Sequence, residues 1–288
     1  MFSLKKIENE YQVSLISCRL STNYFFSFLI LSIFASLKSD VMKILVCISK
    51  TPDTTAKISF TDNDTKFNES GIQFIINPYD EWYALVRAIE LKEKDPSTLI
   101  HLVHVGPAEN DAIIRKALAL GGDEAFRINS RPGDDYYVAG QIASIAKDQH
   151  YDLIFTGKET IDYNGSSVGG MIAEFLELPY ISLATKFELN GNTATITREI
   201  EGGEEVDEAT LPLVVSCQKG MAEQRIPNMR GIMSARTKPL KAIEPVAIDS
   251  LTSISSFELP APKQGVKMIP EDHPEELVRL LHEEAKVF

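Results

Sequence analysis

Continuous apolar runs alternate with amphipathic stretches from Met42 to about Tyr180. The runs predict buried strands at residues 43–48, 99–105, 125–128 and 152–156, with a short extended segment at 71–76. Apolar residues at helical spacing predict helices near residues 80–89, 112–120, 134–147 and 171–176. Continuous apolar strands separated by amphipathic helices are typical of a parallel sheet that is covered on both faces. We therefore expect an α/β fold, a Rossmann-like doubly wound parallel sheet.

This topology predicts where a ligand binds. Right-handed crossovers with a strand order of 3-2-1-4-5 bring the first and fourth strands side by side. Doubly wound sheets bind ligands beyond the carboxyl ends of their strands, at the point where the strand order reverses. The loops after Cys47 and after Thr156 are therefore expected to face each other.

The loop from Gly157 to Gly170 carries the strongest site signal. It is rich in small residues and leads from a strand to a helix N-terminus, an arrangement that favours an anion. Ser166 and Ser167 offer hydroxyl groups for a ligand or for capping the helix. The chain has neither a GxxxxGK[ST] nor a GxGxxG motif, so an ordinary Gly/Ser turn with a helix cap remains the alternative.

The pattern becomes antiparallel after Tyr180. Residues 181–189 and 193–200 flank the hairpin turn signal Asn190-Gly191, a second turn is expected at 201–204, and another strand at 209–216. Residues 217–240 lose periodicity but keep Met and Arg side chains, which are enriched at interfaces. Residues 217–233 are thus a candidate partner-recognition loop, with a plain surface loop as the alternative.

Both ends of the chain differ from this central domain, residues 42–240. Residues 1–41 contain an apolar run at 24–35 that is short of the roughly 20 residues needed to span a bilayer. We expect translation to begin at Met42, with 1–41 outside the fold; a signal-peptide core is the alternative. Residues 241–288 form a proline-punctuated arm that ends in a predicted helix, and we expect the arm to pack on another subunit.

Composition and charge narrow the functional classes. The 288 residues include 29 Lys+Arg and 41 Asp+Glu, and a formal net charge of -12 argues against nucleic-acid binding. Three cysteines without a CxxC spacing predict no disulfide framework. His101 and His104 lie three apart in a predicted strand and point to opposite faces, so a shared metal is not expected. No constellation of catalytic side chains is apparent, and no enzymatic activity is expected.

Five stretches of sequence match one known family. They are Ile44-Leu45-Val46-Cys47-Ile48-Ser49-Lys50 with Asp53, Asn77-Pro78-Tyr79-Asp80-Glu81, Gly157-Lys158-Glu159-Thr160-Ile161-Asp162, Arg198-Glu199-Ile200-Glu201-Gly202-Gly203 with residues 211–215, and Pro227-Asn228 with Ile232-Met233. They occur in family order over most of the chain, which from Met42 onward resembles the β subunit of electron transfer flavoproteins.

The resemblance implies an electron carrier without catalytic residues, in an adenine-nucleotide-hydrolase-like fold in the bacterial cytoplasm. Its implied partner is an electron transfer flavoprotein α subunit, with which it shares a FAD. Its implied donors are acyl-CoA and other flavin dehydrogenases, and its acceptor is a quinone oxidoreductase that feeds the quinone pool. No membrane segment is implied.

The family's AMP contacts can be carried over by position. They correspond here to Cys47, Asn77, Pro78, Tyr79, Asp80, Val105, Gly157, Lys158, Glu159, Thr160, Ile161, Asp162, Tyr163, Asn164, Gly165, Ser166, Ser167 and Val168. Tyr79 also matches an aromatic position that approaches the flavin. In the docking loop, at about 218–226, Met221 is the candidate apolar anchor, and Arg225 and Met229 are further partner-binding candidates.

The nucleotide itself has an alternative. The ending Val168-Gly169-Gly170 resembles electron-bifurcating relatives, whose β subunit holds a second FAD in place of AMP. Two other classes are rivals to the carrier. An ATP-cleaving enzyme of the same fold needs an SGGxDS-type loop, which is absent, and a stand-alone adenine-nucleotide sensor leaves the hairpin and the arm unexplained.

Overall fold

The computed structural model describes residues 41–262 and 265–288, so the expectations for the N-terminal extension lie outside the described residues. The chain divides into two compact units. The first contains the described residues up to Pro52 and Phe74–Leu251, and the second contains Asp53–Gln73 and the described residues after Leu251.

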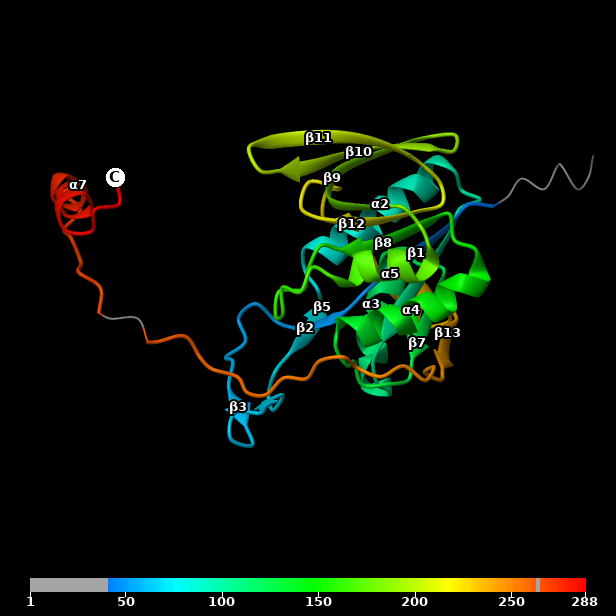
Figure 1. Ribbon diagram of the computed structural model, residues 1–288, viewed down its shortest axis with the longest axis horizontal. Helices are drawn as coiled ribbons and strands as arrows, with labels where there is room; N and C mark the ends of the chain where they lie inside the picture. Colours follow the sequence, from blue (N-terminus) through cyan, green and yellow to red (C-terminus); the bar gives the residue numbers. More distant parts are fainter. Residues whose placement is uncertain (1–40, 263–264) are drawn as a thin grey trace, which may run out of the picture. The chain divides into compact units, whose positions relative to one another are not determined.

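The first unit is built on a nine-stranded sheet in the order β11-β10-β9-β12-β8-β1-β6-β7-β13 (Figure 1). The strands are β1 (Lys43–Cys47), β6 (Leu99–Val105), β7 (Glu124–Ile128), β8 (Leu153–Gly157), β9 (Tyr180–Asn190), β10 (Thr193–Ile200), β11 (Gly203–Thr210), β12 (Leu213–Cys217) and β13 (Leu240–Ile243). All neighbours from β9 to β13 pair in parallel, whereas β10 runs antiparallel to both β9 and β11. The predicted order is confirmed for the four predicted strands, and β12 takes the fifth place.

Helices cover both faces of the sheet, as the apolar strands predicted. The core on one face includes residues of α2 (Asp80–Lys94) and α3 (Asp111–Leu120), and that on the other includes residues of α4 (Asp135–Gln149) and α5 (Val168–Leu176). Alternate residues of β1 enter the two cores: Ile44 and Val46 lie in the first, and Leu45 and Cys47 in the second. Burial on both faces explains why β1 is continuously apolar.

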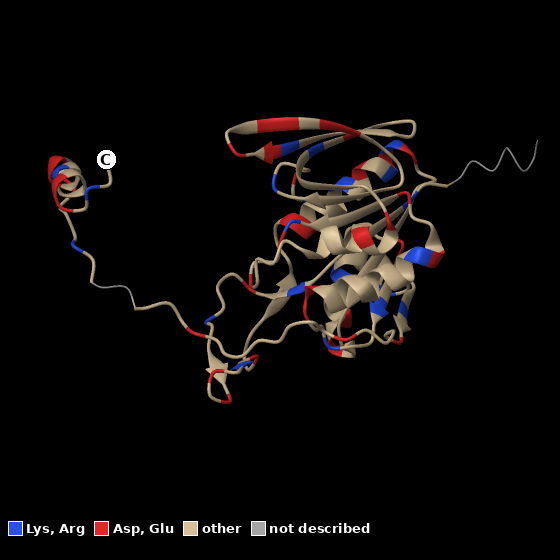
Figure 2. Cartoon of the chain, viewed as in Figure 1, with Lys and Arg blue, Asp and Glu red and all other residues tan. Residues whose placement is uncertain are grey.

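Two strands of the nine-stranded sheet were not predicted from the sequence. A single strand was predicted at 209–216, but the structure has β11 and β12, separated by Leu211 and Pro212. The sequence of β11, GEEVDEAT, is mostly exposed and acidic, and its red band in Figure 2 marks the edge of the sheet. β11 is a strand because all its residues pair with β10. β13 likewise pairs only with β7. The segment without periodicity also holds a short helix, α6 (Met229–Ala235).

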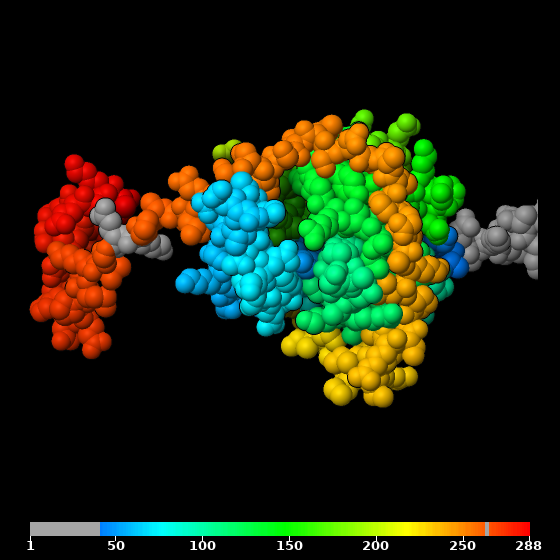
Figure 3. All heavy atoms as spheres, turned by 90° about the horizontal axis from the view of Figure 1, so that it is seen from below, coloured from blue at the N-terminus to red at the C-terminus, as the bar shows by residue number. Residues whose placement is uncertain are grey.

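The chain after β13 is tied to α4 (Figure 3). The buried amide of Gln141 donates to the Val246 carbonyl at 2.7 Å and accepts the Val246 N–H at 2.9 Å. The Asp134 carboxylate accepts the Leu251 N–H at 2.7 Å. These bonds hold residues 246–251 as a strap on the first unit.

The second unit has little regular structure. It contains β3 (Phe60–Thr61), paired with β4 (Lys66–Phe67), and helix α7 (Pro274–Glu283). Phe60 stacks on Phe257 with ring centroids 4.7 Å apart, and the Phe257 N–H donates to the Asp64 carbonyl at 2.7 Å. Among the described residues, no helix is long and apolar enough to cross a bilayer.

Candidate functional site

The carboxyl ends of β1 and β8 lie side by side, as the predicted crevice requires. Gly157 ends β8 directly against the first turn of α2. A Cβ atom at Gly157 would lie 2.7 Å from Cγ of Glu81 and 3.2 Å from Cβ of Asp80. Only glycine permits this approach, so the close contact between β8 and α2 depends on it.

The run Asn77–Asp80 is bonded to the loop after β8. The Asn77 side-chain amide donates to the Glu159 carbonyl at 2.8 Å, and the Glu159 N–H donates to the Asp80 carboxylate at 3.1 Å. Two sequence stretches about 80 residues apart, both of which carry the family resemblance, are therefore bonded to each other beside the carboxyl end of β8.

Two buried polar atoms in this region have no hydrogen-bond partner among the described residues. They are Oδ1 of Asn77 and Oγ1 of Thr156. A buried polar atom without a partner costs free energy, so native sites usually supply one. The Asn77 oxygen and the Thr156 hydroxyl could each form a hydrogen bond with a polar ligand at the carboxyl ends of the strands.

Glu81 lies beside Gly157, close to the carboxyl ends of β1 and β8. Its carboxylate accepts the Ser49 N–H at 2.5 Å and the Ser49 hydroxyl at 2.7 Å. Burial raises the pKa of Glu81 to about 8; the bonds from Ser49 oppose this rise, and the charges of Asp80 and Asp162 add to it. Burial also raises the pKa of Asp80. A cation or hydrogen-bond donor that approaches these carboxyl groups would stabilise their charged form and lower their pKa.

The loop from Gly157 to Val168 ends at the N-terminus of α5, whose first N–H groups lack intrahelical partners. Asn164 and Ser166 have positive φ values of 52° and 54°, a turn geometry that orients backbone N–H groups together. Ser167 occupies the N-cap position but does not cap, because its hydroxyl donates to Asp135. The Ser166 hydroxyl donates to Glu159 at 3.3 Å.

The remaining predicted contacts differ in accessibility. Cys47 and Val105 are buried in the core, where burial raises the pKa of the Cys47 thiol, so their side chains are almost inaccessible to solvent. Tyr79 is 51% exposed and Tyr163 is 61% exposed. Pro78, Lys158, Thr160 and Ile161 are half-buried, and Asp162 and Gly165 are exposed. The Lys158 ammonium pairs with Glu159 at 2.9 Å.

Sequence reasoning missed four residues of this site. Ser49, Thr156 and Asp135 join it through the contacts above, and Glu81 was recognised in a motif but not assigned to the site. One signal for Glu81 was available. An acidic residue in the first turn of a helix usually lies on the surface, yet Glu81 lies four positions before Leu85 and therefore on the same helix face as part of the apolar stripe.

The proposed docking loop has a different geometry from the expectation. Met221 is only 3% exposed and packs in the core, so it presents no apolar surface to a partner. Ile226 is 87% exposed and Met229 is 73% exposed. Arg225 forms ion pairs within the chain.

Both histidines of β6 are buried and lie within hydrogen-bond distance of groups in the fold. His101 Nδ1 lies 2.8 Å from the Tyr151 hydroxyl, and His104 Nδ1 lies 2.9 Å from the Ile48 carbonyl. Burial lowers the pKa of His104 to about 4, so the ring is neutral near pH 7. No group of three or more potential metal ligands occurs in the described part of the chain.

Comparisons with known proteins agree on one family. The family model of the electron transfer flavoprotein domain matches residues 64–248. The electron transfer flavoprotein subunit beta of Bacillus subtilis is 39% identical over 262 residues, covering 86% of this chain and 100% of that protein. The human subunit beta is 29% identical over 253 residues, covering 85% and 99%. The caffeyl-CoA reductase-Etf complex subunit CarD of Acetobacterium woodii is 32% identical over 203 residues, covering 69% and 77%. The chain therefore belongs to the electron transfer flavoprotein family, among its β subunits.

Proposed function

We propose that this chain is the β half of a heterodimeric electron carrier. With an α subunit it shares a FAD, which supplies the redox chemistry while the protein supplies position and electrostatics. Flavin dehydrogenases such as acyl-CoA dehydrogenases give it electrons, and a quinone oxidoreductase accepts them. The observation that carries this proposal is the match to family β subunits along their full length. The proposed location of this electron carrier is the bacterial cytoplasm.

The crevice between β1 and β8 is the proposed site for AMP. Three kinds of group in this region suit the parts of a nucleotide. The unpartnered Asn77 Oδ1 and Thr156 Oγ1 can bind polar atoms of the base or ribose, and the exposed Tyr163 can contact the base or ribose. The free N–H groups at the start of α5 suit a phosphate. The Ser166 and Ser167 hydroxyls now bind carboxylates and must turn to reach a phosphate. In this proposal AMP is structural and stabilises the folded heterodimer by binding it.

The partner surfaces follow from exposure. Ile226 and Met229 form the proposed docking surface for redox partners, because both are apolar and mostly exposed. The arm was expected to pack on another subunit from residue 241 onward, but β13 and the strap bind its first part to this chain. Only the arm after Leu251, residues 252–288, is proposed to pack on the α subunit. Its helix α7 leaves Leu277 and Val278 exposed, which suits an apolar partner surface.

A second FAD in place of AMP is the alternative. Two observations favour it: the Val168-Gly169-Gly170 ending at the N-terminus of α5, and the similarity to a subunit of an A. woodii reductase-Etf complex. Gly169 lies close to Thr156 and Tyr180, and a Cβ there would be 2.7 Å from Thr156 Oγ1. Glycine at this position therefore lets the first turn of α5 pack closely against Thr156 and Tyr180.

One experiment tests these proposals. The chain is co-expressed with its α-subunit gene, the complex is purified, and bound nucleotides are extracted and counted per heterodimer. One FAD and one AMP support the main proposal, whereas two FAD support the alternative. A colourless homodimer without an α subunit would overturn both and favour the nucleotide sensor.

A further inference from the structure

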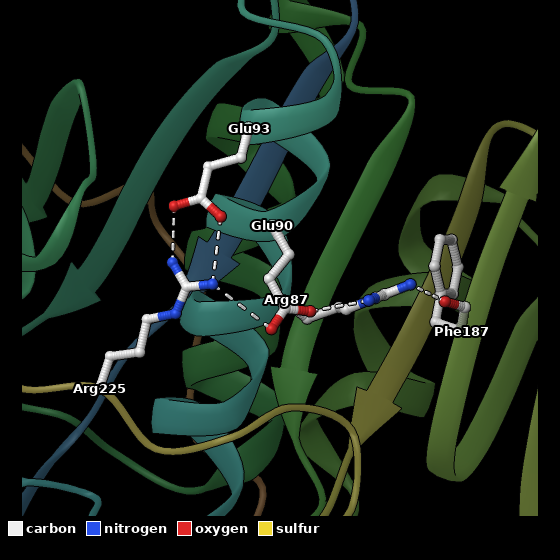
Figure 4. Close-up of polar contacts among 5 residues, drawn as sticks. All are labelled: Arg87, Glu90, Glu93, Phe187 and Arg225. Atoms are coloured by element: carbon white, nitrogen blue, oxygen red, sulfur yellow. Dashed lines mark hydrogen bonds and ion pairs between the residues drawn. The ribbon is translucent and has the colours of Figure 1, made fainter.

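Arg225 lies in the docking loop, yet its side chain binds helix α2 of the same chain (Figure 4). Its Nη1 is 2.6 Å from Oε1 of Glu93 and its Nη2 is 3.1 Å from Oε2, a two-point contact. Nη2 also lies 3.7 Å from a carboxylate oxygen of Glu90. Two-point contacts fix the guanidinium plane more tightly than a single ion pair does.

The backbone of Arg225 is held as well. The indole N–H of Trp82, on the same helix, donates to the Arg225 carbonyl at 3.0 Å. Trp82 and Glu93 are eleven residues apart, about three helical turns, so they lie on the same side of α2. We call the contacts of Arg225 with Trp82, Glu90 and Glu93 the latch.

The helix side of the latch is itself braced. Glu90 also pairs with Arg87 at 2.7 Å, and Arg87 donates to the Phe187 carbonyl in β9 (Figure 4). Arg87 and Glu90 are both largely buried, so solvent screens this pair less than an exposed one. The latch therefore joins the docking loop to a rigid part of the sheet.

The segment after the latch is only partly packed against the rest of the chain. A hollow of about 380 Å³ is lined by residues 225–228 of that segment together with Ile89, Leu120 and Lys238. Ile226 points its side chain into solvent. At the far end, the Asn228 side chain accepts the Gly231 N–H at 2.8 Å and caps α6. Residues 225–229 are thus bonded to α2 at one end and lead into the capped first turn of α6 at the other.

We propose that Arg225 is a positioning residue. Its contacts with Trp82 and Glu93 hold residues 225–229 in the conformation that presents Ile226 and Met229 to a redox partner. This inference rests on the proposed docking function. It assigns Arg225 a partner within its own chain, whereas the sequence pointed to a contact with another protein. Two oxygens of Glu93 and one of Glu90 already surround its guanidinium group.

A charge swap tests the latch in the intact heterodimer. The variants are Arg225→Glu, Glu93→Arg and the double swap, with an acyl-CoA dehydrogenase reduced by butyryl-CoA as the electron donor. We expect each single variant to raise KM for the dehydrogenase about tenfold with little change in kcat, because only docking is impaired. The double swap restores an ion pair between positions 93 and 225 but places the new carboxylate beside Glu90, so KM should fall well below that of either single variant without reaching the original value.

Hydrogen exchange of residues 225–229 gives a readout that is independent of electron transfer. Exchange should speed up in both single variants and in Trp82→Phe, and slow again in the double swap. The matched control is Lys186→Glu, which removes an exposed cation 4.0 Å from Glu204 on the hairpin and should change neither measurement.

Two results would overturn the latch. One is a raised KM in Arg225→Glu with a normal KM in Glu93→Arg, which would place the Arg225 contact on the partner. The other is exchange that stays unchanged in every variant. If the unmodified heterodimer accepts no electrons from the dehydrogenase, the proposed function fails, but the exchange rates still decide whether the latch holds the segment.

Discussion

The Glu81 carboxylate binds both the N–H and the hydroxyl of Ser49, at 2.5 Å and 2.7 Å. Glu81 lies in the first turn of α2, and Ser49 follows β1, so the pair joins a helix N-terminus to the carboxyl end of the central strand. The contact also places an ionisable group where water does not reach it.

The burial of Glu81 predicts a pH dependence of stability. Its pKa rises from 4.5 in the unfolded chain to about 8 in the fold, so the folded state binds more protons between these values. This contribution is fully present below pH 4.5 and is lost as the pH rises toward 8, with a slope of at most about 1.4 kcal/mol per pH unit.

The variant Glu81→Gln tests this dependence, because its amide is isosteric, cannot ionise, and retains an acceptor and a donor for Ser49. Denaturation midpoints of the heterodimer are measured from pH 5 to pH 8. The stability of the variant relative to the original protein should increase with pH across this range. Parallel curves would show that Glu81 does not titrate as a buried carboxyl group.

Gly157→Ala should damage the crevice. The new Cβ meets the first turn of α2 at 2.7 Å, so the helix or the loop must move, at a cost of about 1–3 kcal/mol in unfolding free energy. We also expect nucleotide occupancy per heterodimer to fall. Gly203→Ala is the matched control, because a Cβ added at Gly203 would have nothing within 4 Å of it. Equal effects of the two substitutions would contradict the close approach at Gly157.

Met229→Ala should weaken partner docking alone. The Met229 side chain is mostly exposed, so its loss should change the unfolding free energy by less than about 0.5 kcal/mol. If it contributes to a docking surface, KM for the reducing dehydrogenase should rise about fivefold. Val206→Ala, at an exposed position on β11, is the control and should leave KM unchanged. A normal KM in Met229→Ala would place the docking surface elsewhere.

Gln141→Leu should release the strap after β13. The substitution leaves the Val246 N–H and carbonyl without their side-chain partners, at a cost of about 1–3 kcal/mol. Chymotrypsin cleavage after Leu251 should become faster, because the strap then opens more often. Gln149→Leu makes the same change at the end of α4 and should leave cleavage unaffected. Unchanged cleavage in Gln141→Leu would show that other contacts hold the strap.

The sequence by itself determined the central sheet and the place of the crevice. Apolar runs such as Leu99–Val105 identified strands buried on both faces, and helical spacing identified the helices between them. Chirality and strand order then placed β1 beside β8. These features follow from short-range periodicity, because periodicity records how many faces of each element are buried.

Only the tertiary structure decided the features that depend on a distant partner. β11 and β13 carry no apolar alternation, and each is a strand because one neighbouring strand offers it hydrogen bonds. The sequence assigned Met221 and Arg225 to a protein interface, whereas the fold buries the first and pairs the second with Glu93, 132 residues away. Ser49 and Glu81 likewise meet only after α2 packs on the sheet. Local patterning reports whether a side chain is buried, but the path of the chain decides which group it meets.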